Sequence, residues 1–353
     1  MKNRLNIFFR VDASETIGGG HFFRCISIAA ALKKRGHLCS FICQEINDYF
    51  LSILDYHSFE LINLPKNSLI SDKDQLFEAS NLTEKIKKNK IHIDVLFVDV
   101  YKINAVWEEK IKTSTDKLFA IDDLANRDHY ADYIIDQNAG RTETDYKIHN
   151  LNRGKILSGT RFAIINQDIA DYRDKALRIR KKIKNKNILI NFGSSSHESL
   201  YSQFIKSLIS SGDMQGKSIS LLSSNKTSNE FKDLLDSLKV RLLTSLSPIE
   251  LAELYISTDF CIGAGGVSAL ERCCLGLPSG VVCIAENQYP GSVQLEKKGC
   301  IKLLNNFPDL TVSIDIIENL LNDDNQLKEL SINSLNEVDG NGLKRILSEV
   351  ENA

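Results

Sequence analysis

Short apolar runs of strand length alternate along the chain with amphipathic stretches of helix length. This alternation is typical of βαβ units, in which successive strands lie parallel in one sheet. The expected strands cover residues 5–11, 38–43, 60–64, 95–100, 118–121 and 133–136, then 188–192, 219–222, 240–243, 259–262 and 280–284. The clearest helical patterns cover 22–34, 197–210, 229–238, 248–257, 268–275 and 293–298. The pattern predicts an α/β fold.

A charged stretch at residues 168–186 separates two such series of strands and helices. We interpret it as a linker, because a single short basic run is more typical of a solvated surface than of a nucleic-acid site. The predicted domains cover 1–167 and 187–353, and a return of the last helix to the first domain is left open. Each half restarts with a strand, a glycine-containing turn and a helix. We therefore expect two doubly wound, Rossmann-like domains that face one cleft.

The amino-acid composition of the chain limits which classes of ligand and environment are expected for it. The 353 residues include 44 Lys and Arg against 46 Asp and Glu, and 42% are hydrophobic. Such a chain is neither disordered nor generally attractive to nucleic acid, so an anionic ligand must be held locally. No apolar run reaches the roughly 20 residues of a membrane span. The eight cysteines lack C-x2-C spacing, which favours reduced, mostly buried thiols in a cytoplasmic protein. We expect a monomer without stable membrane insertion.

The loop after the first strand carries the densest set of polar residues. Glycines at the crossing from strand to helix let the main chain approach a ligand and leave helix amides free as donors. An imidazole there is suited to proton transfer, because histidine titrates near neutrality and the helix N-terminus favours its neutral form. The candidate residues are Arg10, Asp12, Gly18, Gly20, His21 and Arg24. A dinucleotide site is not indicated, since the third glycine of G-x-G-x-x-G is missing.

A second glycine loop lies between the expected strand 259–262 and the helix 268–275. Gly265 and Gly266 present main-chain amides to phosphate oxygens, and Ser268 adds a hydroxyl donor. Glu271, one turn further, is positioned to accept hydrogen bonds from a ribose diol. No Gly-Lys-Ser/Thr follows, which disfavours Mg-ATP chemistry.

Other polar groups also follow strands. Glu286, Asn287 and Gln288 come after the strand 280–284, and Gly193 with Ser194 comes after 188–192 as a possible second anion nest. Asp99 and Tyr101 end one strand, and Asp122 and Asp123 end the next. No histidine or further carboxylate completes a ligand set beside them, so we expect neither a metal nor a cofactor.

Together these motifs resemble the UDP-2,4-diacetamido-2,4,6-trideoxy-β-L-altropyranose hydrolase family of pseudaminic acid biosynthesis. The resemblance covers most of the chain, and its first and last motifs are specific in combination. It implies the two-domain glycosyltransferase B fold, related to the transferase that adds N-acetylglucosamine to the lipid-linked peptidoglycan precursor. The motifs are R-x-D-x-x-x-x-I-G-x-G-H-x-x-R-C at 10–25, A-x-x-L-x-x-x-G at 29–36, D-V-Y at 99–101, I-D-D-L-A at 121–125, and the segments within 264–288.

The resemblance implies a nucleotide-sugar hydrolase that breaks the anomeric C–O bond with water, with inversion and without a metal. His21 would be the base, while Tyr101 and Asn287 match positions that line the sugar and Gln288 assists them. Residues 1–167 would hold the sugar and residues 187–353 the UDP. The nucleotide site would use Gly265, Gly266, Ser268 and Glu271. The product would serve glycosylation of flagellin, or a capsule or other surface polysaccharide.

Two segments depart from the family pattern. Gly-Gly and a nearby Asp are usual where this chain has Gly193-Ser194-Ser195-Ser196-His197, and Ser-Thr with an aromatic residue is usual where it has 267–270, Val-Ser-Ala-Leu. These departures concern the identity of the sugar more than the UDP site. Two alternatives stay open: a glycosyltransferase of the same fold that uses a UDP-sugar donor, and a nucleotide-sugar binding protein without catalysis.

Overall fold

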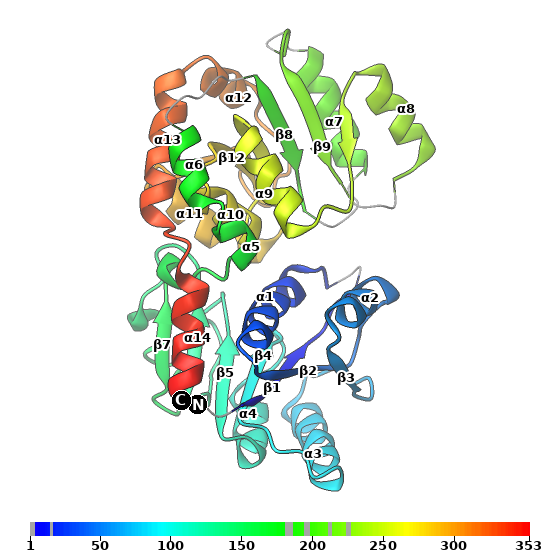
Figure 1. Cartoon of the computed structure of the whole chain (residues 1–353), viewed down its shortest axis with the longest axis vertical. Coiled ribbons are helices and arrows are strands. Elements are labelled where there is room, and N and C mark those ends of the chain that lie inside the picture. Colours follow the sequence, from blue (N-terminus) through cyan, green and yellow to red (C-terminus); the bar gives the residue numbers. More distant parts are fainter. Residues whose placement is uncertain (1–3, 15–16, 181–185, 194–197, 211–213, 224–226) are drawn as a thin grey trace. The chain divides into compact units, whose positions relative to one another are not determined.

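The computed structural model describes residues 4–14, 17–180, 186–193, 198–210, 214–223 and 227–353. The chain forms two compact units. Unit 1 comprises Met1–Ile164 together with Gly342–Ala353, and unit 2 comprises Ile165–Asn341. The chain therefore passes from unit 1 to unit 2 and returns for its last helix (Figure 1).

Unit 1 is built on a seven-stranded, wholly parallel sheet with the order β3-β2-β1-β4-β5-β6-β7. The strands are β1 (Asn6–Val11), β2 (Leu38–Cys43), β3 (Glu60–Asn63), β4 (Val95–Asp99), β5 (Lys117–Ile121), β6 (Tyr133–Asp136) and β7 (Lys155–Ser158). The helices are α1 (Gly20–Lys34), α2 (Asp48–His57), α3 (Asp72–Lys88), α4 (Ala105–Ile111) and α14 (Gly342–Asn352), with short 3-10 turns η1 (Lys112–Ser114), η2 (Glu143–Tyr146) and η3 (Thr160–Phe162).

Unit 2 repeats this plan with a six-stranded parallel sheet in the order β10-β9-β8-β11-β12-β13. Its strands are β8 (Asn187–Asn191), β9 (Ser218–Leu222), β10 (Arg241–Leu243), β11 (Phe260–Ala264), β12 (Ser279–Val282) and β13 (Lys302–Leu303). Its helices are α5 (Gln167–Ala170), α6 (Arg173–Ile179), α7 (Glu198–Ser210), α8 (Asn229–Ser237), α9 (Pro248–Ser257), α10 (Val267–Cys274), α11 (Tyr289–Lys297), α12 (Ile314–Leu321) and α13 (Asp324–Glu337), with the 3-10 turn η4 (Glu286–Gln288).

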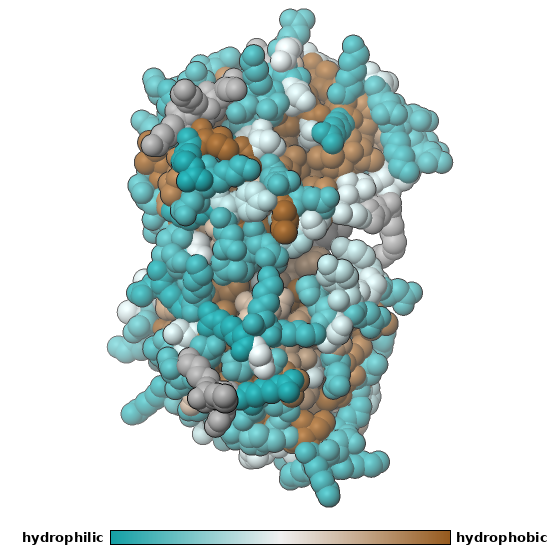
Figure 2. Space-filling model, in the orientation of Figure 1, coloured by the Kyte–Doolittle hydropathy of each residue, from teal (hydrophilic) through white to brown (hydrophobic). Residues whose placement is uncertain are grey.

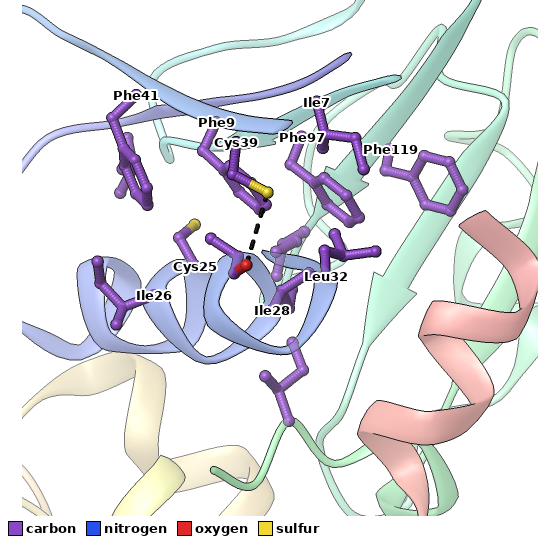
Figure 3. Close-up of a cluster of buried hydrophobic side chains, with 14 of the residues drawn as sticks. Ile7, Phe9, Cys25, Ile26, Ile28, Leu32, Cys39, Phe41, Phe97 and Phe119 are labelled. Carbon is purple, nitrogen blue, oxygen red and sulfur yellow. Dashed lines mark hydrogen bonds between the residues drawn. The ribbon is translucent and has the colours of Figure 1, made fainter. Parts of the chain in front are cut away.

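The sheet of unit 1 is buried on both faces, which explains its continuous apolar strands. In β1, Ile7 and Phe9 belong to one buried cluster and Phe8 to another, because successive side chains point to opposite faces. Figure 3 shows the first cluster against α1. A row of rings crosses it from strand to strand with centroids 4.2–5.2 Å apart, distances at which aromatic rings are in close contact. The row is Phe41, Phe9, Phe97, Phe119 and Tyr133.

The α/β fold with parallel sheets is confirmed, and each expected strand lies within two residues of a strand in the structure. Two strands, β7 and β13, were not predicted. Both lie at one edge of their sheet and are short, so they lack the long apolar run that marks an inner strand.

The charged segment 168–186 differs from the predicted linker. Helices α5 and α6 occupy much of it, and it belongs to unit 2. Arg173 donates to main-chain oxygens of Cys274, Val338 and Leu335. The charged side chain of Arg173 therefore binds main-chain carbonyl groups within unit 2.

All eight cysteines are described, and each is buried and outside any disulfide. Burial raises the pKa of several of these thiols, for example that of Cys43 to about 12, so they are inert at neutral pH. Polar and charged residues cover much of the face in Figure 2, with hydrophobic residues in separate patches. Within the described ranges, no helix combines the length and the apolar character that a bilayer crossing demands.

Candidate functional site

The loop between β1 and α1 places His21 at the start of a helix. Helix α1 begins at Gly20, and its N-cap residue Gly19 makes no side-chain cap. Gly18 has φ +81°, and a Cβ on Gly19 would lie 2.9 Å from the Phe23 ring. Glycine is thus favoured at 18 by the backbone and at 19 by close packing. His21 follows where the strand order of the sheet reverses, between β1 and β4.

His21 pairs with Asp99, the last residue of the neighbouring strand β4. Nδ1 of His21 lies 2.6 Å from Oδ1 of Asp99. Nη2 of Arg24 also lies near Nδ1, at 2.8 Å. We assign the proton to Nδ1, because the nearer partner is a carboxylate oxygen, which can only accept a hydrogen bond. Nε2 of the neutral imidazole then keeps its lone pair. The pair is a base whose tautomer is fixed by a carboxylate.

Arg24, one turn further along α1, holds the carboxylate of this pair. Its Nε and Nη2 donate to the two oxygens of Asp99, each at 2.5 Å, and its Nη1 donates to Asp123 at 2.9 Å. Burial acts to raise the pKa of Asp99, but the charge of Arg24 and the bond from His21 lower it to about 2. Asp99 is therefore ionised at neutral pH.

The carboxylates of Asp99 and Asp123 are thus both bound to Arg24. Within the described part of the chain, the side chains that could together hold a metal ion are instead His92, Asp94 and Asp116. Asp94 and Asp116 precede β4 and β5, so this group lies at the opposite edge of the sheet from His21.

Tyr101 packs edge-on against His21, with ring centroids 4.4 Å apart and planes at 89°. The guanidinium of Arg127 lies over the ring of Tyr101, 5.8 Å from its centroid. Arg127 is itself held by Asp122 and by the main-chain oxygen of Ile103. The base therefore sits beside a phenol ring whose position is fixed by a second arginine.

Arg10 and Asp12, at the end of β1 and in the loop after it, form an ion pair next to this site. Arg10 is completely buried and binds Glu78 through Nε at 2.8 Å and Asp12 through Nη1 at 2.7 Å. Because both acids satisfy its charge, Arg10 is a structural cation, while Asp12 reaches the surface of a pocket.

That pocket lies in unit 1 at the carboxyl ends of β1, β2 and β4 and has a volume of about 460 Å³, which is the size of a small-molecule site. It is lined by Asp12, Ile17, His21, Gln44, Glu45, Asn67, Ser68, Leu69, Asp99, Val100, Tyr101 and Lys102. It brings together three residues predicted from the sequence, Asp12, His21 and Tyr101. Arg24 reaches it through Asp99.

Sequence reasoning missed several other residues that line this pocket. Gln44 and Glu45 directly follow β2, which is the neighbour of β1, and their position after a buried strand is the signal that could have found them. Asn67 and Ser68 lie in a loop without regular structure, where the sequence offers no comparable signal.

In unit 2, the glycine loop leads into α10 as predicted. Gly266 is the N-cap with φ +73° and makes no side-chain cap, and Ser268 follows in the first turn. A Cβ on Gly265 would lie 2.8 Å from Ser292 Oγ and 3.0 Å from Gln288 Cβ, so Gln288 lies beside this loop. The first amides of α10 are therefore presented beside an amide side chain, an arrangement suited to an anion.

Glu271 and Arg272 have different environments on α10. Arg272 is completely buried and donates to Ala264 O at 2.6 Å and to Ser279 Oγ at 3.1 Å. Glu271 is half-buried, and desolvation raises its pKa to about 7 although Arg272 opposes the shift. Arg272 fixes the helix on the sheet, whereas the side chain of Glu271 stays partly exposed.

The remaining predicted residues lie at other strand ends. Glu286 and Asn287 are in η4, exposed and half-buried respectively. Gly193 follows β8 with φ +92°, and its amide donates to Asn191 Oδ1 at 2.9 Å. Ser194 to His197, which include the departure from the family pattern, lie outside the described residues.

Neither a protein-family model nor a curated protein sequence matches this chain. Solved structures do match along its length. MurG of Acinetobacter baumannii has a TM-score of 0.70 at 12% identity, covering 99% of this chain and 100% of the other. UDP-GlcNAc 2-epimerase of Neisseria meningitidis, bound to UDP-GlcNAc, has a TM-score of 0.66 at 14% identity, with 99% and 100% covered. Anabaena HepE in complex with UDP has a TM-score of 0.56 at 15% identity, with 98% and 99% covered.

These likenesses define the class of fold. The chain has the GT-B fold, which glycosyltransferases share with UDP-GlcNAc 2-epimerases. The expectation from the sequence is confirmed at this level.

Proposed function

We propose that this protein is a nucleotide-sugar hydrolase that releases UDP from a UDP-linked 2,4-diacetamido-2,4,6-trideoxyhexose. The observation that carries the proposal is the His21–Asp99 pair on the wall of a polar pocket. The fold agrees with a UDP-sugar ligand, because structures of this fold include ones bound to UDP-GlcNAc and to UDP. The β-L-altropyranose sugar of pseudaminic acid biosynthesis is the substrate that the family motifs favour.

In the proposed reaction, Nε2 of His21 takes a proton from water as the water oxygen attacks the anomeric carbon. The bond from that carbon to the diphosphate oxygen breaks, its electron pair leaves with UDP, and the configuration inverts. Asp99 stabilises the imidazolium that forms, and Tyr101 and Asn287 position the sugar. General-base catalysis of this kind contributes about 10²- to 10⁴-fold.

UDP is proposed to bind unit 2. Main-chain amides at Gly265 and Gly266 and the hydroxyl of Ser268 would stabilise the charge that develops on the diphosphate. Glu271 would accept hydrogen bonds from the ribose, and Glu286 and Gln288 would complete the contacts. The near-neutral net charge of -2 agrees with anion binding by main-chain amides.

The test is to incubate purified protein with the sugar nucleotide and to follow UDP and free sugar by NMR. UDP and the inverted anomer should form together, and His21→Asn should slow this release by about 10²- to 10⁴-fold. His92→Asn is the matched control, since His92 is exposed at the other edge of the sheet and should leave the rate unchanged. Unchanged substrate with wild-type protein would falsify the proposal.

The alternative of a glycosyltransferase rests on the fold, since MurG shares it. A transferase would release UDP only when an acceptor is added. Comparing turnover with and without a membrane fraction separates the two, because a hydrolase needs water alone.

A further inference from the structure

The lining of the pocket includes a segment just after β2 whose main chain is held by hydrogen bonds. The amides of Gln44 and Glu45 both donate to Oδ1 of Asp12, at 2.7 and 3.1 Å. On the other side, the amide of Ala13 donates to the main-chain oxygen of Glu45 at 2.9 Å. The main chain of Glu45 is thus held at both ends, and its side chain starts from a fixed point.

Buried charges support this segment. Asp12 is paired with Arg10, which is completely buried and also binds Glu78 through two nitrogens. The Gln44 side chain donates to Glu78 as well. Because these residues are hydrogen-bonded or ion-paired to one another, the network holds this part of the pocket in place before any ligand binds.

Most polar side chains on the pocket are already engaged. Asp99 binds Arg24 and His21, and Asp12 binds Arg10 and two amides. On the facing loop, Asn67 Nδ2 donates to Asp74 O at 2.6 Å and Ser68 Oγ donates to Asp74 Oδ2 at 2.6 Å. Lys102 Nζ donates to Ser68 O at 3.2 Å.

Glu45 differs from these groups. Of the three acidic residues that line the pocket, it alone forms no side-chain hydrogen bond or ion pair with a residue that the structure describes. It is half-buried, so its carboxylate has lost part of its hydration without gaining a protein donor. A carboxylate accepts only, and a ligand hydroxyl or amide N–H is the partner that would complete it.

We propose that Glu45 is a specificity-determining residue that accepts a hydrogen bond from a hydroxyl or amide N–H group on the sugar of the substrate. This inference rests on the proposed function, in which the pocket of unit 1 holds the sugar. A sugar without a donor at that position leaves the carboxylate unpaired, which is the arrangement that rejects an analogue most strongly. Glu45 acts on binding, and the transfer of the proton belongs to His21.

The test compares Glu45→Gln with Glu60→Gln in release of UDP from the sugar nucleotide. Glu60 is an exposed glutamate of unit 1 outside the pocket, so its variant controls for the loss of one negative charge. Glu45→Gln should raise KM by about 10- to 100-fold and change kcat by less than about threefold, because a charged acceptor is replaced by a neutral one. Glu60→Gln should match the wild type.

A second measurement reads binding without turnover. In the His21→Asn background, calorimetry with the sugar nucleotide should show a Kd raised by Glu45→Gln by the same factor as KM. A Kd and KM within twofold of the parent protein overturn the role of Glu45. Should the wild type bind the sugar nucleotide but release no UDP, hydrolysis fails, and the calorimetric comparison still decides for or against Glu45.

Discussion

At the scale of single residues, Asp99 has two duties, since it orients His21 and neutralises Arg24. Asp99→Asn should lower kcat for UDP release by about 10²- to 10⁴-fold, because an amide no longer fixes the imidazole tautomer. The double variant with His21→Asn should be no slower than the slower single variant, since the two residues act as one unit. Additive losses in steady-state rates would show that Asp99 acts apart from His21.

The raised pKa of His129 predicts that the stability of unit 1 depends on pH. It is buried, and although burial acts to lower its pKa, Glu108 at 2.8 Å and Asp122 raise it to about 9. A folded pKa above the unfolded value of about 6.5 stabilises the fold fully below that pH, and the contribution is lost as pH rises through 9. Unit 1 should therefore lose up to about 3 kcal/mol between pH 6.5 and 9.

Urea unfolding followed by the fluorescence of Trp107 measures this effect, because the single tryptophan is buried in unit 1. His129→Gln should be less stable at pH 6 and should show a flatter dependence on pH. A wild-type midpoint that stays constant from pH 6 to 9 contradicts a charged, paired His129.

The sequence marks Tyr101 and Gly265 as candidates because they closely follow apolar strands, and His21 because it begins the helix after the first strand. The side chains that contact these candidates could not be identified from the sequence. The sequence marks Asp99 and Asp123 as strand-end carboxylates, but only the structure shows that one arginine binds both. Glu45 was missed although it follows a buried strand, and its main-chain contact with Asp12 is long-range, so no local pattern shows it.

At the scale of elements, a substitution at Gly266 should show whether the loop before α10 matters for UDP binding as well as for stability. Gly266 has φ +73° and ψ −147°, a conformation that essentially only glycine adopts, so Gly266→Ala should cost about 1–3 kcal/mol. Gly216→Ala, at φ +75° and with open space around its Cβ, places a side chain at positive φ elsewhere in unit 2 and is the control for backbone strain. Only Gly266→Ala should weaken UDP binding, by at least about tenfold in calorimetry. Equal UDP affinities would place the diphosphate away from α10.

The element that sequence patterns misassigned was the charged segment before β8. Arg180 is buried there and donates to main-chain oxygens of Leu275, Thr258 and Tyr255. A hydropathy pattern counts it as solvated, since a buried arginine and an exposed one are the same letter. The strands were predictable because their apolar runs are buried on both faces, a property that each run carries by itself.

Arg180→Lys should therefore lower the free energy of unfolding of unit 2 by about 2–4 kcal/mol, because one ammonium group cannot reach three diverging carbonyls. Arg178→Lys, two residues earlier and exposed, is the matched control and should change it by less than about 0.5 kcal/mol. Far-UV circular dichroism during urea unfolding measures both. Equal midpoints would mean that the Arg180 bonds add no stability.

At the scale of the whole molecule, unit 1 depends on a helix that follows unit 2 in the sequence. Leu343, Ile346, Leu347 and Val350 of α14 belong to the same buried cluster as Phe9 and Phe97. Ile346→Ala should cost unit 1 about 2–5 kcal/mol and lower the midpoint of the Trp107 transition. Ser348→Ala, on the exposed face of α14, should leave that midpoint in place. An unchanged midpoint in Ile346→Ala would mean that α14 does not complete this core.

The return of α14 also sets an order of events during synthesis. The segments of unit 2 are all translated before the helix that closes the core of unit 1, although unit 1 begins first. On a ribosome, unit 2 can thus finish folding while the core of unit 1 still lacks the side chains that α14 contributes. The proposed base, His21, lies in unit 1, so during synthesis the proposed nucleotide site in unit 2 can form before the proposed catalytic site is complete.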